Sequence, residues 1–365
     1  MIESVYQAVF RHPTEQKLNF NSDNVYGVHP KIMNAIVEAN QRLTDVSYCH
    51  DEGAAQVDAA LSKIFEKEVK AFAVMNGTGA NSLALSATCP SYGGIFCHEG
   101  SHINTDECNC PELFSGGAKL IAMPGRDNKL VPAALEALLK NFVHGEHGPK
   151  PSAISLSQVT ELGTVYSVEE IHALTKVAKA SGMKSHMDGA RFANALVNLG
   201  CTPAEMTWKA GIDVLSFGGT KNGGMILESV VFFDTGLAEN FLRQRKRAGQ
   251  LLSKGRFLSA QMLAYLKDGL WLENAGRANV LALDLANQLQ SISGVRLAAK
   301  VQANEIFAIV PQRLSTALEA EGGKFHEWPF DGLADGEVCL RLVLSFATPE
   351  ADVQKFASLA KRLGN

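Results

Sequence analysis

The chain lacks the features that mark nucleic-acid-binding, membrane and secreted proteins. Among its 365 residues, Lys and Arg number 34 and Asp and Glu number 38, so the formal net charge is −4, without the basic surplus that a nucleic-acid binder usually shows. No apolar run approaches the roughly 18 residues that a membrane helix needs. The first twenty residues lack the basic and then apolar pattern of a secretory signal. We therefore expect a soluble cytoplasmic protein that binds neither nucleic acid nor membrane.

The cysteines show neither a disulfide framework nor a metal site. There are seven, an odd number, in a large chain without a signal pattern, which indicates reduced thiols. Cys108 and Cys110 form a lone C-x-C, and zinc would need two further ligands at regular spacing, which are not evident. We therefore predict no metal site.

Nucleotide-binding fingerprints are absent as well. The Gly-rich segment 76–81 (NGTGAN) lies between a short apolar run, 71–75, and a helical pattern, but G-x-G-x-x-G fails at Ser82 and no Gly-Lys-Ser/Thr follows. Backbone N–H groups at such a helix start bind phosphate well, and Thr78 adds a hydroxyl. Gly-rich turns between strand and helix also occur for purely geometric reasons, so the segment alone leaves both interpretations open.

What is present is an alternation of strand-like and helical segments from about residue 52 to 235. The predicted strands are 71–75, 94–98, 118–123, 152–159, 183–187, 213–217 and 225–233, and the predicted helices are 51–69, 80–88, 130–142 and 168–180. This alternation predicts an α/β domain in which helices cover both faces of a mostly parallel sheet.

After residue 237 the pattern changes. Two or three long helices come first, followed by strand-like runs at 295–299, 305–310 and 337–346 and by helices at 312–321 and 349–363. This order is typical of a smaller α+β domain packed on the first. Because the first fifty residues lack clear periodicity, we expect an N-terminal arm over 1–50, a large domain over 51–250 and a small C-terminal domain, with its linking helices, over 251–365.

Asp188 and Lys221 form the pair on which the functional prediction depends. Each lies at or just after the end of a predicted strand, where ligands bind in open α/β sheets. They are 33 residues apart, and a strand–helix–strand unit takes roughly 30 or more, so both can reach the same sheet edge. The pair suggests pyridoxal 5′-phosphate (PLP) held at its two ends, with Asp188 facing the pyridinium nitrogen and Lys221 forming a Schiff base with the aldehyde.

Three further side chains have both a functional and a structural interpretation. His102 can stack on a cofactor ring and accept a proton near neutral pH, although its position also fits a loop histidine without a role. Arg191, three residues after Asp188, can bind a cofactor oxygen or a substrate carboxylate. Arg341 lies in the apolar run VCLRLVL, where burial is costly without an anion. A substrate carboxylate, a structural salt bridge or an exposed strand face would each account for it.

HMDGAR (186–191), the later lysine, NGTGAN and the context of His102 resemble the threonine aldolase/β-eliminating lyase family of fold-type I PLP enzymes. The resemblance extends from Asn21 to Val343. It implies a transferase-like fold, with a mostly parallel seven-stranded sheet between helices and a small C-terminal α+β domain.

The resemblance also implies how the cofactor is held. Asp188 pairs with the pyridine nitrogen, Lys221 carries the Schiff base, and His102 stacks on the ring. Gly77 and Thr78 hold the phosphate. Lys221 and His102 are then the catalytic residues.

For the substrate, the resemblance assigns Arg191, Arg341 and Ser22 to the ring hydroxyl and the substrate carboxylate. Tyr48 belongs to a segment that places an aromatic near the site from across a dimer. The family is usually a homotetramer built from such dimers, so we expect this assembly here.

The chain departs from the family at three places. Residues 159–163 read VTELG where many members read N-T-H-N-G, so Glu161 replaces a histidine near the substrate hydroxyl. Residues 48–51 read YCHD rather than Y-G-D-D, and 219–222 read GTKN where S-K-G is common. These differences leave open the substrate preference and the base, for which His50 or a water is an alternative.

The predicted function is retro-aldol cleavage of a β-hydroxy-α-amino acid. L-Threonine, L-allo-threonine or phenylserine would yield glycine and an aldehyde, because the protonated cofactor ring takes up the electrons of the Cα–Cβ bond. The alternatives are another PLP reaction on the same fold, such as β-elimination or transamination, and a cofactor-free sensor that keeps an old fold.

Overall fold

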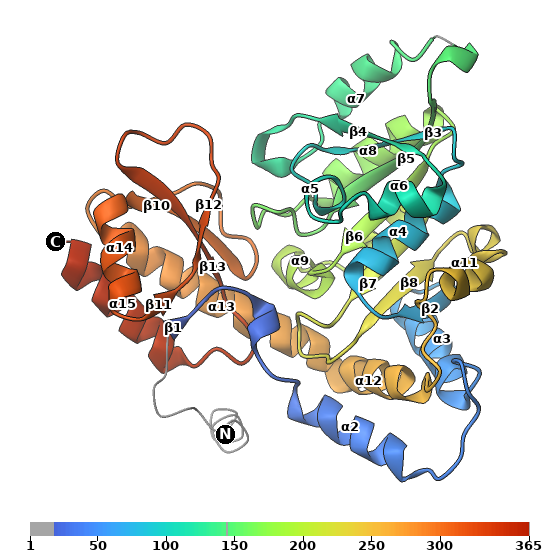
Figure 1. The fold of residues 1–365 in the computed structure, drawn as a ribbon, viewed down its shortest axis with the longest axis horizontal. Helices are drawn as coiled ribbons and strands as arrows, with labels where there is room; N and C mark the ends of the chain where they lie inside the picture. Colours follow the sequence, from blue (N-terminus) through green and yellow to red (C-terminus); the bar gives the residue numbers. More distant parts are fainter. Residues whose placement is uncertain (1–17, 144, 365) are drawn as a thin grey trace.

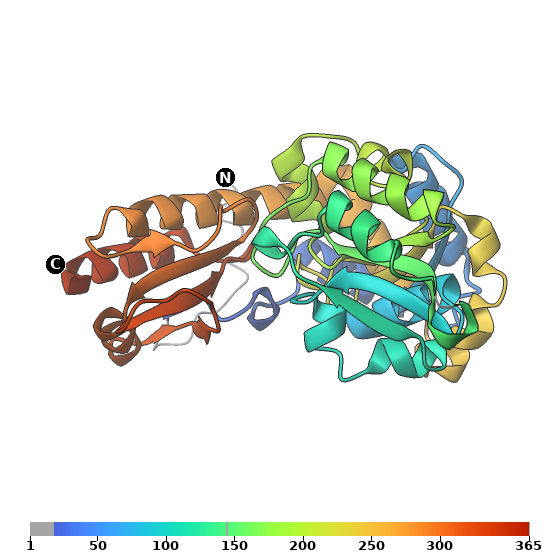
Figure 2. The same ribbon diagram turned by 90° about the horizontal axis from the view of Figure 1, so that it is seen from above.

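The structure, a computed structural model, describes residues 18–143 and 145–364. It has a large lobe built around one sheet and a smaller lobe that carries the C-terminus (Figure 1). The long helix α13 (Leu270–Gln290) runs between the two lobes, as the orange helix of Figure 2 shows. The first seventeen residues of the predicted arm lie outside the described residues.

A seven-stranded sheet forms the centre of the large lobe, in the order β2-β8-β7-β6-β5-β3-β4. The strands are β2 (Lys70–Val74), β3 (Gly93–His98), β4 (Lys119–Met123), β5 (Lys150–Ser157), β6 (Lys184–Gly189), β7 (Val214–Gly218) and β8 (Glu228–Phe232). The predicted mostly parallel sheet is confirmed, because only β8 runs antiparallel to its neighbours. The nine residues between β7 and β8 are too few for the crossover that parallel neighbours require.

Helices cover both faces of this sheet. They are α3 (Glu52–Ile64), α4 (Gly77–Thr88), α5 (His102–Thr105), α6 (Cys110–Ser115), α7 (Pro132–Leu139), α8 (Val168–Ala180), α9 (Phe192–Leu199), α10 (Pro203–Met206) and α11 (Phe241–Arg247). Successive strand residues enter different cores: Val214 belongs to the same buried cluster as Leu83 of α4, whereas Leu215 belongs to the cluster that includes Leu174 of α8. This alternation explains why the strands read as continuous apolar runs.

The small lobe is built on an antiparallel sheet of order β12-β13-β10-β9. Its strands are β9 (Arg296–Leu297), β10 (Glu305–Pro311), β12 (His326–Trp328) and β13 (Glu337–Val343), and its helices beside α13 are α14 (Gln312–Ala320) and α15 (Glu350–Gly364). The predicted strand at 295–299 is therefore only two residues long. The sequence pattern did not predict β12.

The N-terminal segment joins both lobes. Its strand β1 (Leu18–Asn19) pairs with β11 (Gly323–Lys324), and Phe20 is buried in the small-lobe core. Helix α2 (Pro30–Gln41) packs on α12 (Arg256–Leu266). The predicted domain boundaries at residues 50 and 250 stay a prediction.

Helix α2 forms although its segment shows no clear periodicity in the sequence. Pro30 starts the helix with a preset φ, and His29 Nδ1 caps it by accepting the N–H of Lys31 at 3.1 Å. Only Ile32 and Ala39 are buried in it, so the apolar stripe is too short to stand out.

Short 3-10 helices complete the connections: η1 (Asp23–Val25), η2 (Arg126–Asn128), η3 (Gly145–His147), η4 (Trp208–Ala210), η5 (Thr235–Ala238) and η6 (Lys267–Gly269). The last of these separates α12 from α13, with Asp268 and Gly269 at positive φ. Within residues 18–143 and 145–364, no helix is long and apolar enough to cross a membrane.

Candidate active site

A cavity of about 420 Å³ opens where the carboxyl ends of β5, β6 and β7 face the small lobe. The sequence-predicted residues that line it are Ser22, Gly77, His102, Asp188, Arg191, Lys221 and Arg341. The small lobe contributes Glu305, Trp328 and Arg341, from β10, β12 and β13. Two predicted residues, Tyr48 and Thr78, are not among its lining residues.

Asp188 and Lys221 do meet at one sheet edge. Asp188 lies near the end of β6, in register with Ser216 of β7, and Lys221 follows the end of β7 by three residues. Both side chains line the cavity. Lys221 forms no ion pair with the residues that the structure describes, so its amine is available to a ligand.

A chain of hydrogen bonds connects Asp188 to His102. Asn81 Nδ2 donates to Asp188 Oδ2 and to Glu107 Oε1, both at 2.8 Å, and Glu107 Oε1 lies 2.9 Å from His102 Nδ1. The backbone N–H of Ala190 donates to the other Asp188 oxygen at 3.0 Å. These bonds fix the carboxylate of Asp188 and leave Nε2 of His102 for the cavity.

Burial and hydrogen bonding shift the pKa values of His102 and Glu107. The hydrogen bond with Glu107 raises the pKa of His102 above its ordinary value, although burial opposes the shift. Burial raises the pKa of Glu107, against the bonds from His102 and Asn81. Because the pKa values of both groups are raised, His102 and Glu107 each bind a proton more readily than they would in water.

The start of α4 presents backbone N–H groups to the cavity. Asn76 caps the helix by accepting the N–H of Gly79 at 2.7 Å, and Gly77 comes first in the helix. A Cβ on Gly77 would meet nothing within 4 Å, so there is open space beside this turn. That space lies where an anion gains most from the helix dipole.

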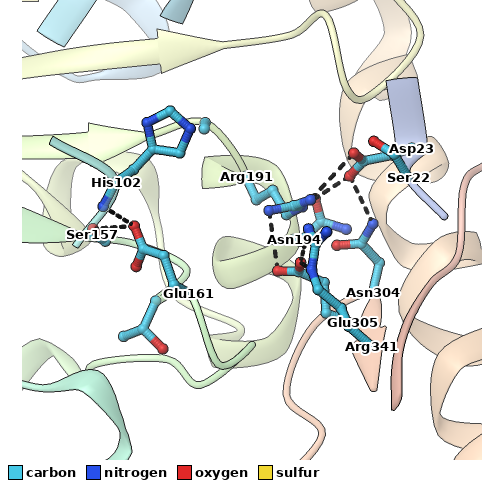
Figure 3. A network of polar contacts seen from close by, with 12 residues as sticks. Ser22, Asp23, His102, Ser157, Glu161, Arg191, Asn194, Asn304, Glu305 and Arg341 are labelled. Carbon is cyan, nitrogen blue, oxygen red and sulfur yellow. Dashed lines mark hydrogen bonds and ion pairs between the residues drawn. The ribbon is translucent and has the colours of Figure 1, made fainter. Parts of the chain in front are cut away.

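On the small-lobe side, two arginines pair with two buried acids (Figure 3). Arg191 donates to both oxygens of Asp23, at 2.8 and 3.2 Å, and lies 3.1 Å from Glu305 Oε2. Arg341 donates from Nε and Nη2 to Glu305 Oε1, at 3.2 and 2.8 Å. The structural salt bridge considered for Arg341 is thus present, while its remaining donors are still open to a substrate.

Glu161 lies on the opposite side of the cavity, beneath His102 (Figure 3). Its Oε1 accepts the backbone N–H of His102 at 2.7 Å and the hydroxyl of Ser157 at 3.1 Å. Burial, with the nearby charge of Asp188, raises the pKa of Glu161 to about 7. The carboxyl group is therefore close to half-ionised near neutral pH.

Two buried groups support the cavity floor. His186 is held by the hydroxyls of Ser155 and Ser216 at 2.9 and 3.0 Å, and burial lowers its pKa to about 4, so it stays neutral. Glu228 accepts the backbone N–H of Thr220 at 3.2 Å, beside Lys221, and burial raises its pKa to about 7. The histidine of the HMDGAR motif is thus a sheet-packing residue.

Tyr48 lies away from this cavity. Its side chain is 39% exposed, Lys246 Nζ lies 4.9 Å from its ring centroid, and its φ is positive, at 59°. Within one chain it has no part in the cavity, so its predicted role requires a second copy.

The sequence did not identify several residues that line the cavity, among them Asn81, Glu107, Glu228 and Glu305. It also did not identify Asp23, which is not a lining residue but accepts a hydrogen bond from Arg191. Asn81 was inside the quoted NGTGAN segment, and Glu107 follows His102 by five residues. Glu305 comes directly before the apolar run 306–310, where a charged residue indicates a buried ion pair. None of these signals identifies a partner without the fold.

Comparison with known proteins identifies the family of the chain. Residues 19–312 match the beta-eliminating lyase family. A low specificity L-threonine aldolase of a Pseudomonas species is 43% identical over 94% of this chain and 97% of its own length. Its counterpart from Pseudomonas aeruginosa is 41% identical over 95% of this chain and 97% of its own length.

Solved structures agree as well. The threonine aldolase of Leishmania major superposes with a TM-score of 0.89 at 28% identity, over 95% of this chain and 99% of that one. A serine palmitoyltransferase of Sphingomonas wittichii shares the fold alone, with a TM-score of 0.69 at 15% identity over 95% of this chain and 86% of that one. The expected fold-type I architecture is confirmed, and the chain belongs to the beta-eliminating lyase family.

Proposed function

We propose that this family member is a PLP-dependent threonine aldolase of low specificity. It cleaves L-threonine, L-allo-threonine or a related β-hydroxy-α-amino acid, phenylserine included, to glycine and an aldehyde. The observation that carries the proposal is the placement of Asp188, Lys221 and His102 around one cavity. The two Pseudomonas relatives, both named low specificity L-threonine aldolases, support the substrate class.

The cavity fits the cofactor at three points. PLP carries an aldehyde and a ring nitrogen at opposite ends and a phosphate at one side. Lys221 provides an amine for the aldehyde, Asp188 a carboxylate for the nitrogen, and the α4 start at Gly77 a place for the phosphate. Thr78, the second residue of this helix, does not line the cavity, so its contact with the phosphate stays a prediction. Asn81 Oδ1 and Glu107 Oε2 are both buried and have no hydrogen-bond partner within the described residues. These two oxygens can therefore still accept hydrogen bonds. When bound, PLP supplies an electron sink for the bond that breaks.

Arg341 and Arg191 are suited to bind the substrate carboxylate. Of five guanidinium N–H donors, Arg341 uses two on Glu305, so others remain for a second carboxylate. Ser22 accepts the N–H of Asn24 at 3.1 Å and keeps its own proton to donate. Anchored there, the amino acid presents Cα toward Lys221.

His102 orients the reacting centre. Glu107 holds Nδ1, which sets the plane of the imidazole, and the raised pKa favours a proton on the ring. A ring fixed in this way can stack on the cofactor and direct Nε2 at the substrate. Because Glu107 is buried and hydrogen-bonded, it keeps the imidazole of His102 in the same orientation when substrate binds and product leaves.

We extend the proposal to assembly and location: a cytoplasmic homotetramer, built from dimers in which Tyr48 reaches the neighbouring site. Exposed apolar side chains from α2 and the following loop support an interface there, namely Met33, Val37, Leu43, Val46 and Tyr48. All seven cysteines are free in the structure.

Product analysis tests the proposed function. Purified protein with added PLP, incubated with L-threonine, L-allo-threonine or phenylserine, should release glycine and the matching aldehyde in equal amounts. Serine supplies the control, because β-elimination from serine releases ammonia. Ammonia from serine, with no glycine from any of the three substrates, would contradict the aldolase assignment and favour an eliminating lyase.

A further inference from the structure

We propose that Glu161 removes the proton of the substrate's β-hydroxyl group. This role rests on the proposed function, since only a β-hydroxy amino acid brings such a proton to the site. Glu161 follows the end of β5 by four residues and lines the cavity beside His102, on the side opposite Arg341 (Figure 3). An amino acid anchored at the arginines would extend its side chain toward this wall.

One oxygen of Glu161 is fixed and the other is not. The backbone N–H of His102 and the hydroxyl of Ser157 both donate to Oε1. Oε2 accepts no hydrogen bond from the residues that the structure describes. The group is therefore held in place while one oxygen remains to accept a proton.

The five other acids that line the cavity have other partners or positions. Asp106 is exposed and accepts the hydroxyl of Thr105 at 2.7 Å. Both oxygens of Asp188 accept protein hydrogen bonds, and both oxygens of Glu305 face arginines. Glu107 holds His102 and Asn81 through Oε1, and its Oε2 is shielded from solvent. Glu228 is bonded to the backbone before Lys221, at the cofactor end. Glu161 alone among these faces the expected hydroxyl position with an uncommitted oxygen.

The surroundings of Glu161 favour proton exchange near neutral pH. Burial and the negative charge of Asp188 raise the pKa of Glu161, and the bonds from His102 and Ser157 limit the rise, leaving it at about 7. A general base works best when its pKa lies near the working pH. The titratable or charged groups that interact with it are Asp188, His102, Arg191, Cys97 and Tyr166.

The step balances without any further reactant. The O–H bond of the substrate breaks, its proton passes to Glu161 Oε2, and its electron pair forms the carbonyl of the departing aldehyde. Bound PLP would accept the electron pair of the Cα–Cβ bond. Cα then takes up one proton, matching the one that Glu161 gained, to give glycine. Nothing is oxidised or reduced overall in the cleavage.

The test compares threonine cleavage with a reaction that needs no hydroxyl base. Glu161→Gln keeps an oxygen for the His102 and Ser157 bonds but cannot accept the proton. We expect its kcat for threonine to fall by about 10²–10⁴-fold. Exchange of the glycine α-proton for deuterium, followed by NMR, should stay within about threefold of wild type, as should the visible absorbance of the bound cofactor.

The outcomes separate this role from the proposed function. Cleavage by Glu161→Gln at the wild-type rate would overturn the role alone, as would an equal loss of cleavage and glycine exchange, which would indicate a structural residue. A wild-type protein that exchanges the glycine proton but never cleaves threonine would overturn the proposed function and this role with it.

Ser157→Ala provides a graded second readout. It removes one donor to Glu161 Oε1, and because that hydrogen bond lowers the pKa, its loss should raise the pKa. In wild type, kcat/KM should fall as pH drops below about 7, where Glu161 becomes protonated. Ser157→Ala should move this fall to higher pH, and Glu161→Gln should abolish it. An unchanged pH profile in both variants would contradict the proposal.

Discussion

The sheet side and the small-lobe side of the cavity stabilise their buried charged side chains with different partners. On the sheet side, Asp188 accepts hydrogen bonds from neutral donors, the side chain of Asn81 and the backbone of Ala190, and no arginine or lysine pairs with it among the described residues. On the small-lobe side, Arg191 and Arg341 are already matched by acids of their own chain. A cofactor thus completes one wall, whereas a substrate carboxylate must share arginine donors on the other.

This difference separates the expected consequences of mutation. Removing the charge of Asp188 from the sheet wall should affect the chemistry, because that charge acts on the cofactor and has no ion-pair partner among the residues that the structure describes. A charge removed from the small-lobe wall should affect stability and substrate affinity, because it leaves an arginine without its internal partner.

Between the sheet wall and the small-lobe wall, the larger effect on turnover is expected from Asp188→Asn. The amide keeps the size of the side chain but loses the negative charge opposite the ring nitrogen, so kcat for threonine should fall by roughly 10²–10³-fold. Steady-state kinetics and the absorbance of bound cofactor measure this. Asp213→Asn is the matched control, since Asp213 lies at the opposite end of β7, where it accepts the N–H of Ser185. Equal losses in both variants would contradict a cofactor role for Asp188.

A smaller effect on turnover, but a clear one on stability, is expected from Glu305→Gln. Glu305 is 2% exposed and bridges two arginines, so losing its charge should lower the free energy of unfolding by about 3 kcal/mol. The KM for threonine should fall, because the substrate carboxylate no longer competes with Glu305 for Arg341. Denaturant unfolding and initial rates give the two values.

Glu337→Gln serves as the control for this second variant. Glu337 pairs with Arg296 on the same small sheet, but that pair is exposed and distant from the cavity lining. The Glu337→Gln substitution should leave the KM for threonine almost unchanged. A higher KM in Glu305→Gln, with unchanged stability, would show that the two walls do not differ as described.

The sheet wall was largely predictable from the sequence. Asp188 and Lys221 follow apolar runs, and the carboxyl ends of neighbouring parallel strands meet at one edge, so their meeting follows from the alternation of elements. His102 could be placed in the same way, after β3.

The small-lobe wall was not predictable in the same way. The sequence indicated that Arg341 would be costly to bury without an anion. The carboxylate that pairs with it belongs to Glu305, on the neighbouring strand β10. Glu305 lies directly opposite Val343 and is therefore diagonal to Arg341. That register follows from tertiary packing. Asp23 reaches Arg191 across 168 residues, from a segment without periodicity. No local pattern encodes either contact.

The central claim is that Lys221 bonds covalently to PLP while Asp188 holds the ring. Borohydride reduction of the protein with PLP, followed by peptide mass spectrometry, tests it most directly. We expect a reduced pyridoxyl group on Lys221, and loss of this label in Lys221→Ala. A label on a different lysine, or an unlabelled protein that still releases glycine from threonine, would contradict it.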